Sequence, residues 1–222
     1  MTFIDQIRTA YNTVADDYHK LVQPMYDTLP FEKAMLGAFA ELVEGKVADV
    51  GCGPGHLTAY MAEALGLDAF GIDLSPEMIT VARREYPAFD FSVGSMLALD
   101  LPDGELGGVL ASYSIIHMPP TEHPKAFSEF HRVLRPGGHV LVMFHVGTEI
   151  RHLSHAYGHD IDLDVHGLDP VAVTWMLEDA GFRVLAKMDR ARSFEGERTD
   201  KCYIVAQRPP LTVTTEPTTN DA

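Results

Sequence analysis

The chain has 222 residues, of which 46% are hydrophobic, and it carries a formal net charge of −15 at pH 7. That length and composition predict one folded domain large enough to bury a sizeable core. The acidic balance disfavours nucleic acids and anionic membranes as partners, because both attract basic protein surfaces.

The two cysteines, Cys52 and Cys202, indicate no disulfide framework. Residues 1–6 have neither the basic nor the apolar region of a secretory signal, and no apolar run approaches the length of a membrane span. We therefore expect a cytoplasmic protein, a monomer or a homodimer, with no nucleic-acid or membrane partner.

The first 44 residues predict two helices. Tyr11, Ala15, Tyr18 and Val22 recur at spacings of four, three and four, which places them on one helix face within residues 3–22. A second helix is expected at about 30–44.

From residue 47 onward, short apolar runs alternate with helical patterns. Helix starts are marked by signals such as Ser75-Pro76-Glu77, an N-cap followed by proline and an acid. We expect strands at 47–50, 69–73, 89–93, 109–113 and 139–144, with helices at 57–65, 76–85 and 122–134. This alternation predicts an α/β fold with a doubly wound, mostly parallel sheet, whose ligand lies at the carboxyl ends of the strands.

The last third of the chain is less regular. Residues 145–168 break the alternation, a helix follows from 170 to 181, and two strands at about 182–190 and 200–207 close the fold. The turn between them, 193–198, is charged. Residues 209–222 are rich in threonine and proline, and we expect them to be disordered.

A glycine loop follows the first predicted strand and leads into a helix. Its sequence is Asp49-x-Gly51-x-Gly53-x-Gly55. Glycines allow positive φ angles and close backbone approach to a ligand, and the helix N-terminus offers free N–H groups. Twenty-two residues after Gly51, Asp73 ends the second strand, where an acid usually binds the ribose hydroxyls of a nucleotide-type cofactor.

Three later segments extend this pattern: Gly94-Ser95-Met96, the run from Leu110 to His117, and the run from Phe130 to Gly138 that ends in Leu-Arg-Pro-Gly-Gly. Together with the glycine loop they resemble the class I S-adenosylmethionine (SAM) dependent methyltransferases over about residues 8–208. The resemblance implies a Rossmann-like, seven-stranded sheet with one antiparallel strand in its last hairpin, an N-terminal helical lid, and a single domain over residues 1–208. It also implies SAM as cofactor, S-adenosylhomocysteine as product and a small-molecule acceptor.

The resemblance further implies which residues bind the cofactor. Asp49 and Gly51 would hold its methionine end, Asp73 would accept hydrogen bonds from both ribose hydroxyls, and the tyrosines of the N-terminal helix would close over it. The full set is Tyr11, Tyr18, Asp49, Gly51, Gly53, Gly55, His56, Asp73, Leu74, Met78, Gly94, Ser95, Met96 and Ser112. For the two tyrosines, a plain aromatic core stripe is an equally good interpretation.

Two positions depart from the family's pattern. Ser95 stands where the residue at the adenine edge is often Asp, and Gly107-Gly108 replaces an acid that often precedes the fourth strand. The first departure suggests that adenine recognition leans on backbone groups.

The histidines are the hardest residues to assign. The spacing His152-x-x-His155-x-x-x-His159 could place three imidazoles on one helix face as metal ligands, but no cysteine is nearby, and we predict no metal site. His117 and His145 follow the fourth and fifth strands, so they are candidate general bases for removing a proton from a hydroxyl or amine acceptor. A carboxylate acceptor would need no base.

Residues 145–168 and the N-terminal helix are expected to form the acceptor site, for a small molecule methylated on N, O or C. Two alternatives remain open. One is an NAD(P)-dependent oxidoreductase, although its G-x-G-x-x-G fingerprint would need glycine where His56 stands. The other is a non-catalytic module that binds SAM.

Overall fold

The computed structural model describes residues 2–26, 29–193 and 197–211. The predicted disordered tail therefore lies outside the described residues beyond position 211, as does the middle of the charged turn predicted at 193–198. In chain order the elements are α1 (Phe3–Tyr26), α2 (Pro30–Ala40), β1 (Lys46–Val50), α3 (His56–Glu63), β2 (Asp68–Asp73), α4 (Pro76–Glu85), β3 (Phe91–Val93), β4 (Leu106–Ser112), the short 3-10 helices η1 (Ile115–His117) and η2 (Pro120–Glu122), α5 (His123–Val133), β5 (Leu134–His145), β6 (Ile150–Ala156), β7 (His159–His166), α6 (Pro170–Asp179), β8 (Arg183–Arg190) and β9 (Lys201–Gln207).

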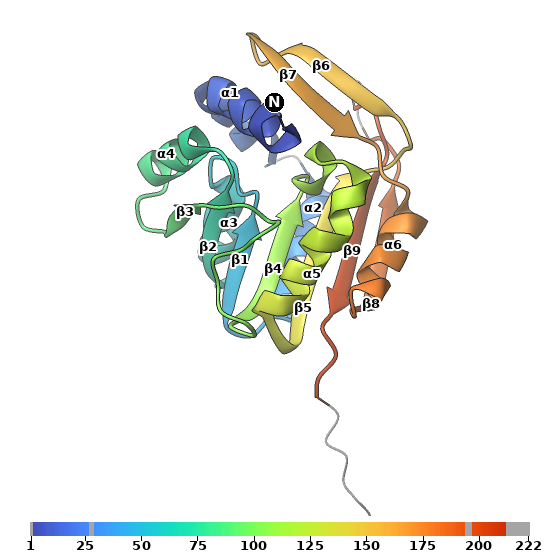
Figure 1. Cartoon of the computed structure of the whole chain (residues 1–222). Coiled ribbons are helices and arrows are strands. Elements are labelled where there is room, and N and C mark those ends of the chain that lie inside the picture. The colour runs from blue at the N-terminus through green and yellow to red at the C-terminus, as the bar shows by residue number, and fades with distance from the viewer. Residues whose placement is uncertain (1, 27–28, 194–196, 212–222) are drawn as a thin grey trace, which may run out of the picture.

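Seven of these strands form one sheet in the order β3-β2-β1-β4-β5-β9-β8 (Figure 1). The pairs from β3 to β5 are parallel, and β9 runs antiparallel to both of its neighbours. The predicted seven-stranded, mostly parallel methyltransferase sheet with one antiparallel strand is confirmed. The chain order reverses between β1 and β4, so the switch point of the sheet lies at the glycine loop that follows β1.

Helices cover both faces of the sheet (Figure 1). On one face, Leu36 and Phe39 of α2 and Met61 of α3 pack against the central strands. On the other, Phe127 of α5 and Leu177 of α6 belong to the largest apolar cluster. All five side chains are fully buried, and each such burial contributes roughly 1.5–3 kcal/mol. This core fixes the strands, and with them the residues at their carboxyl ends.

The structure explains the glycine pair at the start of the fourth strand. A Cβ atom on Gly107 would lie 1.8 Å from the carbonyl oxygen of Glu44, and one on Gly108 would lie 2.9 Å from the ring of Phe39. The loop after α2 thus presses on β4 so closely that no side chain fits. An acid at this position would require a different path for that loop.

Residues 145–168 form a hairpin of β6 and β7 instead of irregular chain or a helix. Its turn places Tyr157 at φ 54° and Gly158 at φ 83°, the positive angles of a tight hairpin turn. The possibility that His152, His155 and His159 share a helix face is therefore wrong.

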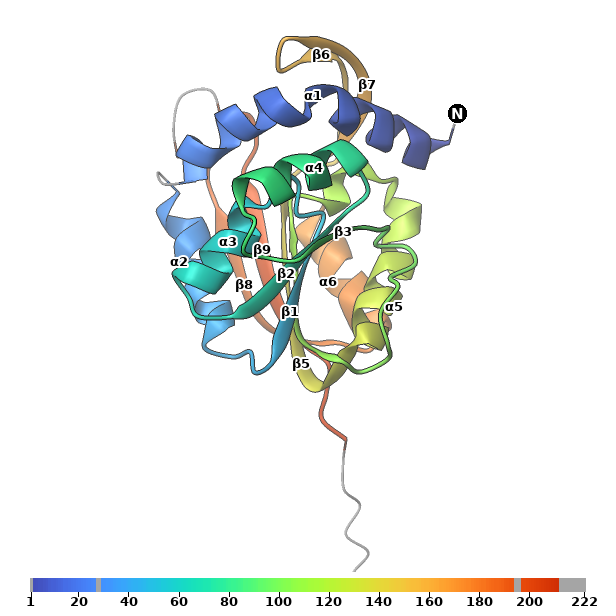
Figure 2. The same ribbon diagram turned by 90° about the vertical axis from the view of Figure 1, so that its left-hand side faces the viewer.

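Helix α1 and this hairpin together roof the carboxyl edge of the sheet (Figure 2). Val14 and Ala15 of α1 pack on Met78 and Val81 of α4. Although α1 is 24 residues long, neither it nor any other helix in the described residues is apolar enough over a sufficient length to cross a bilayer.

Candidate active site

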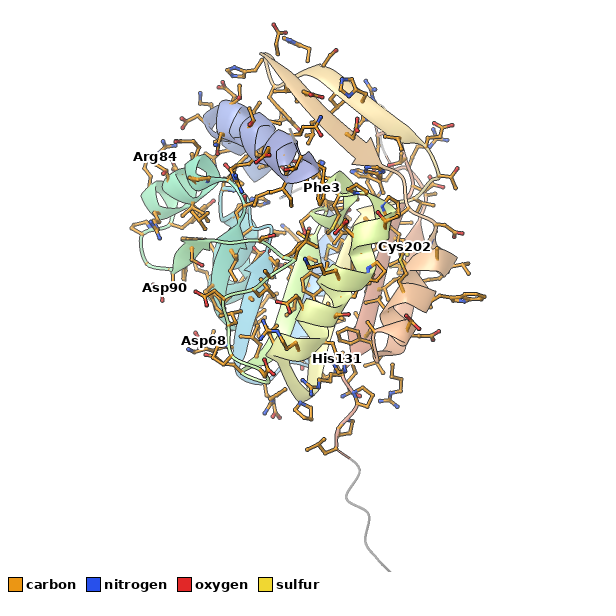
Figure 3. All side chains as sticks on the ribbon, viewed as in Figure 1. Phe3, Asp68, Arg84, Asp90, His131 and Cys202 are labelled. Atoms are coloured by element: carbon orange, nitrogen blue, oxygen red, sulfur yellow. The ribbon has the colours of Figure 1, made fainter. Side chains whose placement is uncertain are left out.

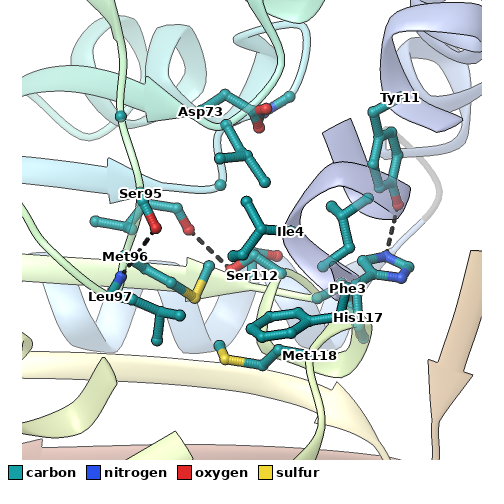
Figure 4. Close-up of a pocket in the computed structure, with 18 of the residues that line it drawn as sticks. Phe3, Ile4, Tyr11, Asp73, Ser95, Met96, Leu97, Ser112, His117 and Met118 are labelled. Carbon is teal, nitrogen blue, oxygen red and sulfur yellow. Dashed lines mark hydrogen bonds between the residues drawn. The ribbon is translucent and has the colours of Figure 1, made fainter. Parts of the chain in front are cut away.

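A cavity of about 740 Å³, which includes space open to solvent, lies between α1 and the carboxyl ends of β1, β2 and β4 (Figure 4). Most of the residues predicted for the site line it: Tyr11, Tyr18, Gly51, Gly53, Asp73, Leu74, Gly94, Ser95, Met96, Ser112 and His117.

Five predicted residues do not line the cavity. Asp49 is buried in β1, His56 begins α3, and Met78 packs between α4 and α1. Gly55 is needed for packing, because a Cβ there would lie 2.7 Å from the Phe91 ring. His145, at the end of β5, is also outside the cavity lining.

The glycine loop turns sharply over the end of β2. Gly51, Gly53 and Gly55 have φ angles of 80°, 53° and 84°, a region that side chains disfavour. A Cβ on Gly51 would also lie 2.2 Å from the Cβ of Ser114. The loop therefore presents bare backbone to the cavity at Gly51 and Gly53, as close approach of a ligand requires.

Asp73 ends β2 with its carboxylate at the cavity wall (Figure 4). One oxygen accepts the backbone N–H of Gly53 and the other that of Ser75, each at 2.8 Å. Burial raises the pKa of this carboxyl, although these backbone bonds oppose the shift. A carboxylate offers about four acceptor directions, so about two remain for ligand hydroxyls. The site thus fits the ribose of a nucleoside cofactor.

Asp49 lies beneath the same loop. One carboxylate oxygen accepts the hydroxyl of Thr58 at 2.7 Å, and the other has no hydrogen-bond partner among the described residues. Burial raises the pKa of Asp49 to about 7. An unsatisfied buried acceptor of this kind is costly and favours a nearby donor or cation, such as the ammonium of an amino-acid ligand.

His117 of η1 and Tyr11 of α1 both line the cavity and contact each other across it. The Tyr11 hydroxyl lies 2.5 Å from Nε2 of His117, and Nδ1 lies 3.3 Å from the carbonyl oxygen of Asp164 in β7. With its proton on Nδ1, the ring donates to this carbonyl and accepts from Tyr11. Burial lowers the pKa of His117 to about 4, so the imidazole is neutral at pH 7 and its unprotonated nitrogen can accept a hydrogen bond.

His145 faces the last hairpin of the sheet. Its Nδ1 lies 2.8 Å from both the Thr199 hydroxyl and the Lys201 ammonium. Burial, and then the charge of Lys201, lower the pKa of His145 to about 3. This nitrogen is already occupied by two donors, so the position of His145 at a strand end does not bring it into the cavity.

The histidines of the hairpin each have a carboxylate of their own. His152 contacts Asp164 and His155 contacts Asp160, both at 2.9 Å, and His159 contacts Asp17 of α1 at 2.8 Å. Within the described ranges no three His, Cys, Asp or Glu side chains are grouped to hold a metal ion. The hairpin supplies none of the cavity lining, and it acts on the site through Asp164 and through Tyr157, whose ring contacts Tyr18 at 5.1 Å between centroids.

A buried charge cluster beside the cavity was missed by the sequence analysis. Arg190 pairs with Glu32 at 3.1 Å and with Glu197 at 2.6 Å, and the Tyr203 hydroxyl donates to Glu32 at 2.6 Å. Arg190 also lowers the pKa of Glu197 to about 2. The Tyr113 hydroxyl reaches Glu32 at 3.1 Å, which links the cluster to the cavity wall. Tyr113 adopts φ 51°, a sparsely populated conformation that is concentrated at functional sites.

Comparison with known proteins agrees with this geometry. Residues 47–138, from β1 through the turn into β5, match the model of a methyltransferase domain family. The chain is 38% identical over 95 residues to a demethylmenaquinone methyltransferase of Chlorobaculum parvum, a match that covers 43% of this chain and 39% of the relative. Residues 47–138 of the chain are therefore a segment of the methyltransferase domain family.

The chain is also 32% identical over 160 residues to phosphoethanolamine N-methyltransferase 3 of Arabidopsis thaliana, a match that covers 67% of this chain and 31% of the relative. The chain thus spans less than two fifths of the length of these two curated relatives.

The fold is shared more widely than the sequence. The crystal structure of magnesium protoporphyrin IX methyltransferase from Synechocystis, with bound SAM, superposes with a TM-score of 0.70 at 17% identity. The superposition covers 94% of this chain and 98% of that chain. At this identity the likeness establishes the fold alone.

Proposed function

We propose that the protein binds SAM in the cavity under α1 and transfers its methyl group to a nucleophilic atom of a small-molecule acceptor. The observation that carries this proposal is the placement of Asp73, a wall carboxylate with spare acceptor capacity, beside a loop of bare glycine backbone. The two relatives named above act, by their names, on demethylmenaquinone and phosphoethanolamine, both small molecules.

The chain's own residues would hold the cofactor as follows. Asp73 accepts hydrogen bonds from the two ribose hydroxyls, and Gly51 and Gly53 let the methionine end approach the backbone. Leu74 and Met96 pack on the adenine. The remaining proposed contacts, at the cavity wall or in the roof, are Tyr18, Gly94, Ser95 and Ser112.

Four residues predicted to bind the cofactor lie outside the cavity lining, and we propose that they shape the elements that form it. Asp49 supplies negative charge beneath the loop, and Gly55, His56 and Met78 shape the loop and the helices beside it. We propose that residues 1–208 work as one methyltransferase domain in the cytoplasm, with residues 1–44 contributing its lid.

Bound SAM supplies a methyl group on a cationic sulfur, so the protein's main task is to position the acceptor, which can lower the barrier by ~7–11 kcal/mol. His117 is the proposed base, because it lines the cavity, is neutral and has Nε2 directed into the site. Nε2 takes the acceptor's proton once the Tyr11 hydroxyl moves aside. His145, the other candidate, lies outside the cavity lining and is not proposed as the base.

A thermal-shift titration tests cofactor choice. SAM and S-adenosylhomocysteine should raise the melting temperature, whereas NADH should leave it unchanged, because a ligand stabilises only the state that binds it. A shift with NADH alone would contradict the proposal and revive the oxidoreductase alternative.

The role of His117 is tested by turnover with an identified acceptor. His117→Ala should lower kcat by roughly 10²-fold or more, as loss of a general base typically does. His155→Ala, at an exposed hairpin site outside the cavity lining, is the matched control and should leave kcat unchanged. Wild-type turnover in the His117 variant would refute its role as base, and absence of methyl transfer to any acceptor by the wild-type protein would favour a non-catalytic SAM-binding module.

A further inference from the structure

The part of the cavity farthest from Asp73 is apolar (Figure 4). Phe3, Ile4 and Ile7 project into it from the first two turns of α1, and Met118 follows His117 on its floor. Figure 3 labels Phe3 at the N-terminal end of α1. The cofactor motifs account for none of these four side chains, so they are available to contact a second ligand.

The charged side chains in the cavity lining are of one sign. Asp73 is the one acidic residue in its lining, and the lining drawn from the described residues includes no Lys or Arg. Outside the lining, Lys201 lies over the Tyr113 ring at 5.9 Å, and the charge of Arg151 contributes to the lowered pKa of His117. Lys201 lies 3.5 Å from Glu197, and Arg151 is exposed on β6.

On protein loaded with S-adenosylhomocysteine, which lacks the sulfonium charge, an anionic acceptor would lose its hydration without gaining a cation from the cavity lining. Burial of an unpaired carboxylate or phosphate costs several kcal/mol. The anionic acceptor would also be repelled by Asp73 and by the net charge of −15 on the chain. Neither cost applies to an uncharged ligand, and burial of its apolar surface stabilises the complex by roughly 25 cal/mol per Å².

We propose that the acceptor is an uncharged, largely apolar molecule that presents one hydroxyl or amine to His117. This inference rests on the proposed methyl transfer. The acceptor's proton moves to Nε2 of His117, and its oxygen or nitrogen forms a bond to the methyl carbon. The carbon–sulfur bond breaks with its electron pair on sulfur, which leaves S-adenosylhomocysteine and a methylated neutral product. Phosphorylated and carboxylated acceptors are selected against.

The test uses a matched pair of ligands on protein saturated with S-adenosylhomocysteine. The compounds 2-naphthol and 3-hydroxy-2-naphthoate share a ring system and a hydroxyl and differ by one carboxylate. Isothermal titration should give 2-naphthol at least tenfold tighter binding.

Two variants test whether the apolar side chains of the cavity cause the preference for 2-naphthol. Ile4→Lys places an ammonium at the apolar end, where it should narrow or reverse the preference for the neutral compound. Val171→Lys makes a comparable change at an exposed position on α6 and should leave the preference unchanged. Circular dichroism confirms folding of each variant, and the wild-type comparison decides the matter if Ile4→Lys does not fold.

Equal or tighter binding of the carboxylate by the wild-type protein would overturn the inference. So would failure of both compounds to bind the loaded protein. Failure of S-adenosylhomocysteine itself to bind is a different result, since it contradicts the proposed function and removes the basis of this inference with it.

Discussion

Replacing Asp49 with Asn should make the protein relatively more stable as the pH rises. Burial raises the folded-state pKa of this carboxyl from 3.8 to about 7. Between these values the folded chain holds a proton that the unfolded chain has released, so the wild-type protein loses stability as pH rises through the folded pKa. The amide that replaces the carboxyl would not titrate, and its oxygen can still accept the hydroxyl of Thr58.

The size of the effect follows from the shift. At 1.36 kcal/mol per pKa unit, the full shift corresponds to about 4 kcal/mol well above pH 7. About 2–3 kcal/mol of this develops between pH 5 and pH 8. The other titrating groups are common to both proteins, so their contributions cancel in the difference.

Urea unfolding of the ligand-free proteins at the two pH values measures this directly. The unfolding free energy of Asp49→Asn minus that of the wild type should increase by about 2–3 kcal/mol from pH 5 to pH 8. A difference that stays constant within about 0.5 kcal/mol would show that Asp49 titrates normally, and the view of it as an unsatisfied buried acid beneath the loop would be refuted.

Two further substitutions test the packing around the site by the same urea assay. Gly107→Ala should lower the free energy of unfolding by about 3 kcal/mol or more, because its Cβ would collide with the Glu44 carbonyl. Gly37→Ala, in an open helical position, is the control and should be neutral or stabilise the protein by up to about 1 kcal/mol. A Gly107→Ala variant as stable as the wild type would contradict the close approach of the loop after α2 to β4. Arg190→Met should cost about 3–5 kcal/mol, because it removes the cation that pairs with both Glu32 and Glu197 and leaves only Lys201, 3.5 Å from Glu197, beside the two buried acids. A loss below about 1 kcal/mol would mean that the cluster is hydrated in solution.

The sheet and the cavity beside the glycine loop could be predicted because their signals are local. The glycine loop, Asp73 and the strand–helix alternation each lie within a short stretch, and the doubly wound topology brings the strand ends together. Ten of the fourteen residues predicted to bind the cofactor line the cavity: Tyr11, Tyr18, Gly51, Gly53, Asp73, Leu74, Gly94, Ser95, Met96 and Ser112.

The hairpin at 150–166 had a readable signal that the histidines concealed. In β7, Asp160, Asp162 and Asp164 alternate with apolar residues, the period-two pattern of a half-exposed strand. A turn with positive φ at Tyr157 and Gly158 precedes it. Histidine spacing suggested a helix because it was considered without its neighbours.

The charge cluster and the placement of His145 were beyond sequence reasoning for a different reason. Glu32 and Arg190 are 158 positions apart, and His145 is held by Lys201, 56 positions away. No periodicity links such residues. The pairing of β9 with β5 and β8 places Lys201 beside both His145 and Arg190, and Glu32 contacts Arg190 from α2.

The central claim is that the carboxylate of Asp73 accepts hydrogen bonds from the ribose hydroxyls of a bound nucleoside cofactor. Isothermal titration of S-adenosylhomocysteine into the wild type, Asp73→Asn and Asp68→Asn tests it most directly. Asp68 begins the same strand, exposed at the opposite edge of the sheet, and is the matched control (Figure 3). Loss of charge-assisted hydrogen bonds should weaken binding at least tenfold in Asp73→Asn and leave Asp68→Asn like the wild type. Equal affinity in all three proteins, or no binding heat with the wild type, would contradict the claim.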